Sequence, residues 1–349
     1  TLVIYLDNSI YIFMMKVSLL LLFTFLNAQI ALPTFQAVHK PHTAVASSLY
    51  DFTSHTFTNC GATGREGPTL ANCKSSYDVS WEDDTDLFNV QTQGVQEWTA
   101  PTTGTYTIEV WGASGTDSGN SGSGDGGRGV KMKGSFSLTN GQILKIIVGQ
   151  VGLEGSYESG GGGGSYVYSD ASDSYPLIAA GGGGGGGVNL NGTDGQTGNS
   201  GSSGTGTDAG SGGSNGNGGT RNTRTGSSQY SAAAGAGWLT DGEDGWDSRN
   251  VAYMTYSGGH APRNDGTGGD NGTPHNADGG FGGGGAARAY SWAGAGGGGG
   301  YSGGGAGASH YGGKGGGGGG GSYNSGSNQF DSSTLGYNTS DGKVIITIN

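Results

Sequence analysis

Charged residues are scarce in this chain. They make up 12% of its 349 residues, against about 25% in typical soluble domains. The balance is acidic, with 27 Asp and Glu against 15 Lys and Arg, a formal net charge of -12. Lys and Arg form no cluster and no arginine–glycine array, since Arg128 stands alone in Gly126–Gly129. A nucleic-acid partner is therefore excluded, because its phosphates require clustered basic side chains.

The sequence also lacks an apolar run of the roughly 20 residues that a membrane-spanning helix needs. A shorter apolar run, Val17–Leu26, follows Met14-Met15-Lys16 and precedes Asn27-Ala28. A basic start, an apolar stretch and a small residue at the cleavage point are typical of a secretory signal peptide. We predict a signal peptide over residues 1–28, translation from Met14 or Met15, a leader over 29–49 and a secreted chain. A buried or membrane-anchoring N-terminal helix is the alternative.

Cysteine occurs only twice, as Cys60 and Cys73. In the oxidising compartment that a signal peptide implies, the two are expected to form a disulfide, with free thiols as the alternative. A loop of this size stabilises the fold by about 3 kcal/mol in the chain-entropy model. Asn191, Asn271 and Asn338 begin N-glycosylation sequons, which suit a secreted chain, although such triplets also arise by chance in Gly- and Thr-rich sequence.

Glycine is what the chain has in abundance, at 81 residues. A glycine loses more backbone freedom on folding than any other residue and contributes no side chain to a core. Long glycine runs therefore indicate either disorder or a packing that requires the missing side chain. The uninterrupted runs are Gly160–Gly164, Gly181–Gly187, Gly282–Gly285, Gly296–Gly300 and Gly315–Gly321.

Ordered packing is favoured because short apolar segments, Ser165–Tyr168 and Pro176–Ala180, directly adjoin glycine runs. Polyglycine can form an extended threefold helix that rises about 3.1 Å per residue, and such helices can hydrogen-bond side by side. Gly181–Gly187 and Gly315–Gly321 suit central positions in a bundle, and Gly303–Ala308 suits an edge. Residues 188–230, which are almost free of apolar side chains, are expected to form a mobile loop.

Strand patterns flank the glycine-rich region. Gly104–Trp111 and Val130–Leu138 alternate between apolar and polar residues, and Asn140-Gly141 predicts a hairpin leading to Ile143–Val148, a strand expected to be buried on both faces. Gly342–Ile348 is again a strand and must pair back with the first block. We therefore predict an all-β fold in which residues 50–159 and 343–349 form a sandwich and 160–321 are an insertion.

Short segments of the chain, taken in order, match one known family. They are Thr56–Thr69 followed by Cys73, Gly94–Pro101, Gly104–Tyr106, Trp111–Ala113, Ile146–Gly152, Gly160–Gly164 with Tyr166-Val167, Pro176–Gly181, Gly279–Gly282, Gly300–Gly304 and Asp341–Val344. On these segments the chain resembles, over about residues 50–349, the extracellular glycine-rich domain of the anaplastic lymphoma kinase and leukocyte tyrosine kinase receptors. This resemblance implies a tumour-necrosis-factor-like β-sandwich that carries an inserted bundle of polyglycine-II helices. It also implies the binding of small basic, cytokine-like protein ligands.

The sequence departs from that family by having no kinase domain, no transmembrane helix, no growth-factor-like module and none of the additional cysteines of the glycine-rich region. Enzymatic activity is therefore not expected, and no cofactor or metal site is predicted. The acidic groups Asp83-Asp84 with Asp86 and Asp241–Gly245 suit either a cation or, more simply, solvent. The six histidines show no metal-ligand spacing and are expected in exposed loops: His39, His42, His55, His260, His275 and His310.

Aromatic residues fall into two groups. Trp98, Tyr106 and Trp111 are expected in the β core. Those within the glycine-rich region are expected to cap the bundle or, alternatively, to anchor a binding face, where Tyr and Trp are enriched. This second group is Trp238, Trp246, Tyr290, Trp292, Tyr301 and Tyr311.

The function predicted from these features is a non-enzymatic extracellular recognition domain with a protein or peptide ligand, possibly a basic one in view of the net charge. The alternatives are a structural or adhesive extracellular protein that associates with itself through a rigid polyglycine bundle, and an ice-binding protein. The sequence identifies no ligand-binding residue.

Overall fold

The computed structural model describes residues 48–119, 124–223, 230–247, 256–272, 277–287, 294–309, 313–331 and 337–349. From Ser48 to Asn349 the chain forms one compact unit. The predicted signal peptide and nearly all of the leader over 29–49 lie outside the described residues. Tyr290, Trp292, Tyr311, His39, His42, His275 and His310 also lie outside them.

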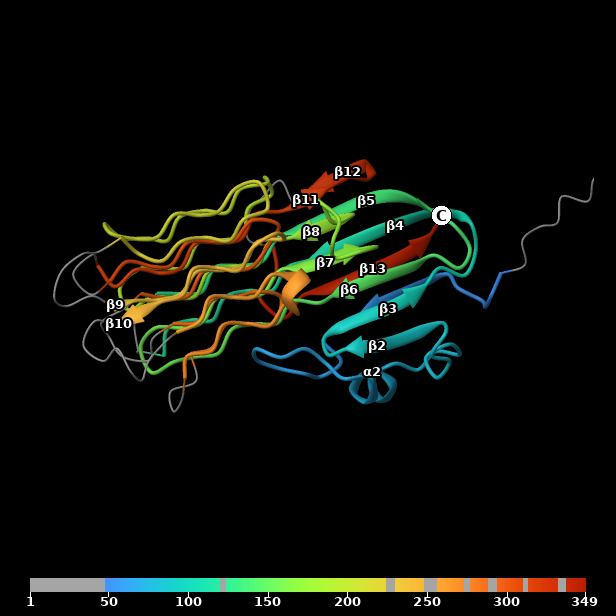
Figure 1. Cartoon of the computed structure of the whole chain (residues 1–349), viewed down its shortest axis with the longest axis horizontal. Helices are drawn as coiled ribbons and strands as arrows, with labels where there is room; N and C mark the ends of the chain where they lie inside the picture. The colour runs from blue at the N-terminus through green and yellow to red at the C-terminus, as the bar shows by residue number, and fades with distance from the viewer. Residues whose placement is uncertain are drawn as a thin grey trace, which may run out of the picture. The chain divides into compact units, whose positions relative to one another are not determined.

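Two antiparallel sheets form one half of the unit (Figure 1). The five-stranded sheet has the order β1 (Ser54–Phe57), β13 (Lys343–Ile348), β4 (Gly104–Trp111), β5 (Lys131–Leu138) and β12 (Ser327–Asp331). The six-stranded sheet has the order β11 (Tyr323–Asn324), β8 (Ile178–Ala180), β7 (Ser165–Tyr168), β6 (Ile143–Ile147), β3 (Val95–Thr99) and β2 (Phe88–Thr92). The described residues add one α-helix, α2 (Leu70–Ser76), a 3-10 turn, η1 (Pro262–Asn264), and a small pair of strands, β9 (Tyr230–Ser231) and β10 (Trp246–Asp247).

The core of the sandwich lies between the two sheets. Alternate residues of β4, Tyr106, Ile108 and Val110, are fully buried, as their apolar–polar alternation predicts. Trp98 of β3 comes from the opposite sheet, and its ring centroid lies 5.9 Å from that of Tyr106. The predicted all-β sandwich is therefore confirmed.

The last strand completes the five-stranded sheet. β13 pairs along its whole length with β4 and also pairs with β1, so residues near both ends of the described chain are neighbours in space. The chain leaves the six-stranded sheet after β8 and returns to it at β11, so β7 and β8, which were predicted to lie in the insertion 160–321, are strands of the sandwich.

Two local expectations in the sandwich were wrong. Asn140-Gly141 forms a turn, with Gly141 at φ 80°, but β5 and β6 on either side of it belong to different sheets and do not form a hairpin. The dipeptide specifies a reversal of direction and not the partner of the next strand. In β6, moreover, Ile143 is half exposed, whereas Leu144 and Ile146 are buried, so the first half of this strand alternates.

The second half of the unit consists of extended glycine-rich segments that run side by side (Figure 1). Hydrogen bonds reveal a period of three in Gly181–Gly187: the N–H groups of Gly182 and Gly185 donate to one neighbouring segment, at Gly299 and Gly296. The N–H groups of Gly183 and Gly186 donate to a second neighbouring segment, at the carbonyls of residues 113 and 116. A period of three with no internal hydrogen bond is the pattern of a polyglycine-II helix.

Gly181–Gly187 is surrounded by six segments. Its N–H groups donate to three of them, and its carbonyl groups accept from three others. Such a position requires glycine on every side, because a Cβ on Gly184 would lie 2.0 Å from the carbonyl oxygen of Gly317. The accepting segments are 296–299, 113–116 and 190–193, and the donating segments are 124–130, 159–162 and 317–320.

Two expectations for the bundle differ from the structure. In the described part of 188–230, the backbone is hydrogen-bonded to the bundle rather than forming a mobile loop, for example Thr193 N–H to Gly317 and Ser202 N–H to Gly319. Gly303–Ala308 is likewise fully buried rather than at an edge. The outer helices need glycine only where they face inward, and so they tolerate many polar residues elsewhere.

Candidate recognition site

A disulfide fixes the loop at the start of the domain. Cys60, which has a positive φ of 50°, is joined to Cys73 of α2, as expected from the sequence, and both side chains are buried. Thr69 caps the N-terminus of α2, because its hydroxyl accepts the N–H of Asn72 and the Asn72 side chain accepts the Thr69 N–H. The loop between the cysteines is thus held at both ends.

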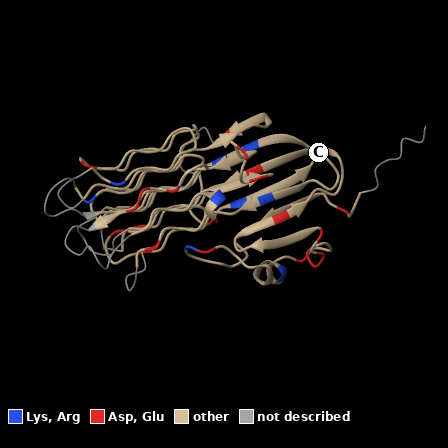
Figure 2. Cartoon of the chain, in the orientation of Figure 1, with Lys and Arg blue, Asp and Glu red and all other residues tan. Residues whose placement is uncertain are grey.

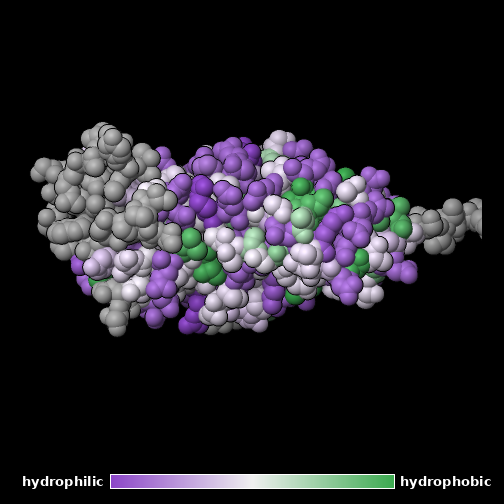
Figure 3. All heavy atoms as spheres, turned by 90° about the horizontal axis from the view of Figure 1, so that it is seen from below, coloured by the Kyte–Doolittle hydropathy of each residue, from purple (hydrophilic) through white to green (hydrophobic). Residues whose placement is uncertain are grey.

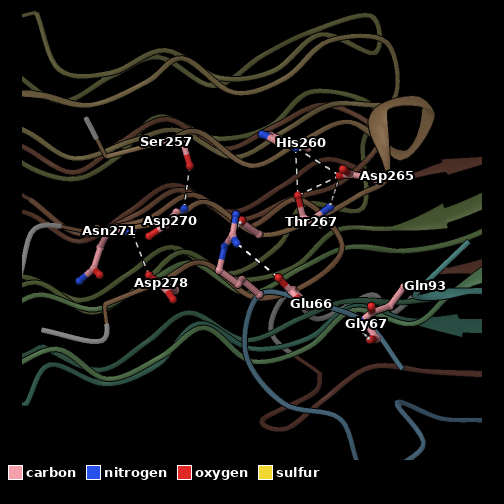
Figure 4. A network of polar contacts seen from close by, with 12 residues as sticks. Glu66, Gly67, Gln93, Ser257, His260, Asp265, Thr267, Asp270, Asn271 and Asp278 are labelled. Carbon is pink, nitrogen blue, oxygen red and sulfur yellow. Dashed lines mark hydrogen bonds and ion pairs between the residues drawn. The ribbon is translucent and has the colours of Figure 1, made fainter. Parts of the chain in front are cut away.

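The same loop attaches the sandwich to the bundle. The Arg65 carbonyl accepts the N–H of Gly268 at 2.8 Å, and the Arg65 Nε donates to the Gly268 carbonyl at 3.2 Å. Next to this contact, the N–H of Phe281 donates to the carbonyl of Gly64, and the Phe281 ring is fully buried. Figure 4 shows this contact region together with the polar residues around it.

Acidic residues gather near this attachment point. Glu66 forms an ion pair with Arg65 at 3.6 Å, and Asp278 accepts the N–H of Asn271 at 2.8 Å (Figure 4). Burial raises the pKa of Asp278 above its usual value, and the neighbouring Asp270 raises it further. Asp278 and Asp270 accept backbone N–H groups of Asn271 and Gly272 and so hold this turn in place, which is a structural role.

His260, Asp265 and Thr267 form a second polar group in Figure 4. The Asp265 carboxylate and the Thr267 hydroxyl lie 3.2 and 2.9 Å from the same ring nitrogen of His260, Nδ1. A hydroxyl–imidazole–carboxylate triad requires the two partners on different ring nitrogens. This group therefore lacks triad geometry, and it orders the turn in which Asp265 has a φ of 95°.

A polar groove of about 690 Å³ lies along the bundle where it meets the sandwich. Three aspartates, Asp117, Asp125 and Asp194, line it together with Arg128 and Asn191. They come from separate segments that run side by side in the bundle. The remaining lining residues are Ser114, Gly115, Thr116, Gly126, Val151, Gly192, Thr193, Gln196 and Thr339.

Backbone hydrogen bonds hold two of the three groove carboxylates in place, and a third bond fixes the backbone of Asp125. Asp117 Oδ1 accepts the N–H of Gly126 at 2.8 Å, and Asp194 Oδ1 accepts the N–H of Arg128 at 2.7 Å. The N–H of Asp125 donates to the side-chain oxygen of Asn191 at 3.0 Å. Three carboxylates and one guanidinium give the groove an excess of negative charge, which attracts cationic groups.

The other acidic residues that the sequence singles out do not form a cation site. Asp83 pairs with Lys74 at 3.3 Å, and Asp84 accepts the N–H of Asp86. Asp241 accepts from the Ala261 N–H and the Asn264 side chain. Throughout the described part of the chain, no group of three His, Cys, Asp or Glu side chains is placed to hold a metal ion.

The aromatic residues occupy three environments. Trp98 and Tyr106 lie in the core as expected, but Trp111 was assigned there wrongly: it is half-buried on the outer face of the five-stranded sheet. Trp238 and Tyr301 are buried between the six-stranded sheet and the bundle, where they close one end of the bundle. Trp246 is 39% exposed in β10.

His55 is the histidine that departs from expectation. It lies in β1, partly buried, with its ring centroid 4.6 Å from that of Tyr77, 4.7 Å from Phe57 and 4.9 Å from Trp81. Burial lowers its pKa to about 4. The sequence pattern predicted exposed loops for all six histidines. The prediction missed His55 because a histidine flanked by Ser and Thr gives no indication that aromatic rings will surround it.

The sequon asparagines differ in accessibility. Asn191 is exposed at the groove. Asn271 is only 7% exposed, and Thr273, the third residue of its sequon, lies outside the described residues. Asn338 is also 7% exposed, and its Nδ2 donates to the carbonyls of Gly112, Ser340 and Asp341. A glycan on Asn338 would displace these hydrogen bonds.

Much of the surface is hydrophilic. Seen from below, hydrophilic residues predominate and apolar residues form only small separate patches (Figure 3). On that face, recognition would rest on polar and charged contacts. In the residues that the structure describes, no helix is both long and apolar enough to cross a membrane.

Comparison with known proteins gives a partial relationship to a receptor. Over 98 residues the chain is 36% identical to the leukocyte tyrosine kinase receptor of Mus musculus. The aligned stretch is 28% of this chain and only 11% of that receptor. No family model matches the chain. The match supports a loose relationship to a receptor, and the β-rich fold and the disulfide are compatible with an extracellular location.

Proposed function

We propose that this chain is a non-enzymatic extracellular recognition domain that binds a protein or peptide ligand through basic side chains. The observation that carries the proposal is the groove in which Asp117, Asp125 and Asp194 converge from three separate segments. The partial similarity to a receptor supports a receptor-like role, and the disulfide supports an oxidising, extracellular setting.

The groove is suited to binding because two of its three carboxylates are fixed before the ligand arrives. Asp117 and Asp194 are held by backbone N–H groups of segments that are themselves bonded to the central glycine helix. Little conformational freedom then remains to be lost on binding. Lysine or arginine side chains of a ligand would pair with the aspartates, and the surplus negative charge would accelerate their approach. Arg128 in the groove lining would disfavour ligands with the wrong register of basic groups.

Substitution of the three groove aspartates by asparagine tests the proposal. Asparagine keeps the Oδ1 acceptor that the bundle uses and removes the charge. With the secreted chain and a fluorescent peptide of alternating arginine and glycine, we expect the Asp117→Asn/Asp125→Asn/Asp194→Asn variant to bind at least about tenfold more weakly and with less dependence on salt.

A matched control removes the same charge elsewhere. Asp83, Asp84 and Asp86 lie in the exposed loop after α2, and their triple substitution by asparagine is expected to leave peptide binding unchanged. Equal loss of binding in both variants would mean that overall charge, and not the groove, attracts the peptide. No binding by the unsubstituted chain would refute the basic-ligand proposal.

A structural or adhesive role is the second candidate, favoured by the enclosure of Gly181–Gly187 by six neighbouring segments. Such a bundle is a rigid body without need of any ligand. This role predicts association of the purified chain that grows with concentration and persists in the groove variant. Sedimentation velocity at several concentrations distinguishes the two candidates.

A further inference from the structure

The outer face of the five-stranded sheet carries a row of cationic and aromatic side chains. Strand register pairs Lys343 of β13 with Trp111 of β4, and Trp111 in turn with Lys131 of β5, so that the indole lies between two lysines. Two residues further along the same face, Glu109 is paired with Lys133. Figure 2 shows Lys and Arg on several strands of the sandwich.

This row is tightly organised. Lys343 Nζ lies 3.7 Å and Lys131 Nζ 5.0 Å from the centroid of the Trp111 ring, within cation–π distance. The Glu109 carboxylate accepts the Trp111 Nε1–H at 2.8 Å and pairs with Lys131 Nζ at 2.9 Å. Glu109 therefore fixes both the indole and one of the two lysines beside it.

The charges of this face do not balance. Glu109 neutralises Lys131, but among the described residues no carboxylate lies within 4.0 Å of Lys133 or Lys343. This face therefore carries excess positive charge, although the net charge of the whole chain is -12. No carboxylate of the described chain pairs with the ammonium groups of Lys133 and Lys343, so both groups are available to a partner.

Exposed rings border the lysines. Tyr337 is 49% exposed, and its ring centroid lies 4.7 Å from that of Trp111. Phe330 of the edge strand β12 is 50% exposed, and Lys131 Nζ lies 5.8 Å from its ring. Large exposed aromatics beside charged groups are typical of the residues that contribute most to protein–protein binding.

We propose that this face, termed the lysine–aromatic face (Trp111, Lys131, Lys133, Phe330, Tyr337 and Lys343), binds an acidic segment of a protein partner in which carboxylates alternate with apolar side chains. The carboxylates would pair with Lys133 and Lys343, and the apolar side chains would cover Phe330 and Tyr337. This inference concerns a different surface and the opposite ligand charge from the acidic groove, so it goes beyond the function proposed above.

A short protein segment fits better than a long polyanion. Surface charges act over about 8 Å at physiological ionic strength, so a partner confined to the face experiences mainly its lysines. A sulfated glycan or an anionic bilayer extends beyond the face to the acidic remainder of the chain, which repels it. Neither of these offers apolar side chains to the exposed rings.

The test uses the secreted full-length chain and a fluorescent peptide of alternating glutamate and leucine. The Lys133→Gln/Lys343→Gln variant is expected to bind this peptide about tenfold more weakly, since two surface ion pairs are lost. The Lys74→Gln/Lys145→Gln variant is the control, because it changes the net charge equally at lysines already paired with Asp83 and Glu97. Its affinity is expected to match that of the unsubstituted chain.

A second variant tests the apolar contribution. Phe330→Ser/Tyr337→Ser keeps every charge and is expected to weaken binding while leaving its salt dependence unchanged. The proposal is overturned if the unsubstituted chain does not bind the peptide, if both lysine variants lose affinity equally, or if the serine variant binds as well as the parent. Tighter, Lys133- and Lys343-dependent binding of heparin, or of phosphatidylserine-containing vesicles, would also overturn it. Because the arginine–glycine peptide reports on the groove separately, failure of either proposal is distinguishable from failure of the other.

Discussion

Replacement of a single enclosed glycine by alanine tests whether the bundle is packed as described. Gly184 lies at the centre of Gly181–Gly187, and a Cβ built on it would lie 2.0 Å from the oxygen and 2.3 Å from the carbon of the Gly317 carbonyl. Ordinary carbon–oxygen contacts are about 3.3 Å or longer, so the neighbouring helix would have to move by about 1 Å. The atoms in the way are backbone atoms, which cannot rotate aside as a side chain can.

The cost follows from what that movement disrupts. Overpacking a well-packed interior costs about 1–3 kcal/mol. Displacing the Gly317 carbonyl also strains its hydrogen bond from the Thr193 N–H, which is worth about 1 kcal/mol. Alanine also reduces the conformational freedom of the unfolded chain, which stabilises the folded state by about 0.4–1 kcal/mol and offsets part of this cost. The Gly184→Ala variant is therefore expected to lose about 1–3.5 kcal/mol of unfolding free energy, a sizeable part of the roughly 5–15 kcal/mol typical of a domain.

Gly198 supplies the matched control. No atom lies within 4 Å of a Cβ at this position, and its φ is not in the left-handed region. Gly198→Ala is expected to be neutral or to stabilise the chain by up to about 1 kcal/mol. Urea unfolding of the two oxidised variants beside the parent measures the difference. If Gly184→Ala unfolds within about 0.5 kcal/mol of Gly198→Ala, the close-packed bundle is refuted.

Three further predictions concern other parts of the unit. Because the pKa of His55 is about 4 when folded and 6.5 when unfolded, the unfolded chain binds the extra proton between these values, so stability falls as pH drops from about 6.5 to 4. This contribution is at most about 3 kcal/mol, and urea unfolding at several pH values should show it missing from a His55→Phe variant. Replacing Cys60 and Cys73 together by serine is expected to cost about 3 kcal/mol, seen as a lower urea midpoint, whereas an unchanged midpoint would mean that packing alone holds the loop. Asn338→Gln is expected to cost about 2 kcal/mol or more, because its Nδ2 donates to three carbonyls. Asn191→Gln disturbs the bond from the Asp125 N–H at an exposed position, so it should cost about 1 kcal/mol or less and remove any glycan mass at the groove, as mass spectrometry of the secreted variants would reveal.

Much of the fold could be predicted from local sequence. The apolar–polar alternation of Gly104–Trp111 predicts which residues of this strand face the core. The final apolar strand has no neighbour in sequence to pair with, so it was expected to pair with a strand that precedes the glycine-rich region. The glycine runs indicated helices packed on all sides. What escaped prediction depends on neighbours distant in sequence, such as the sheet to which the chain turns after Asn140-Gly141. Trp111 directly follows the buried Val110, so the alternation of the strand already places it on the outer face, and its assignment to the core disregarded that period.

The order of the segment after Val188 was missed although a signal exists. Gly192, Gly195, Gly201 and Gly204 recur at multiples of three residues, and a Cβ on any of them would lie 2.1–2.6 Å from a backbone oxygen of a neighbouring helix. An outer polyglycine-II helix needs glycine only on the side that faces the bundle. A period of three among polar residues is therefore the pattern to look for, and a low apolar content alone does not indicate a mobile loop.

The candidate groove had no comparable signal, since Asp117, Asp125 and Asp194 each stand among small polar residues. The bundle alone brings them together. Gly184 donates its N–H to the Thr193 carbonyl and accepts the N–H of Gly127, so one central residue holds two of the segments that form the groove. Any shift of this helix moves the carboxylates relative to one another. Close glycine packing is thus the means by which residues without a shared motif are held at fixed spacing, and it links the stability of the fold directly to the geometry of the groove.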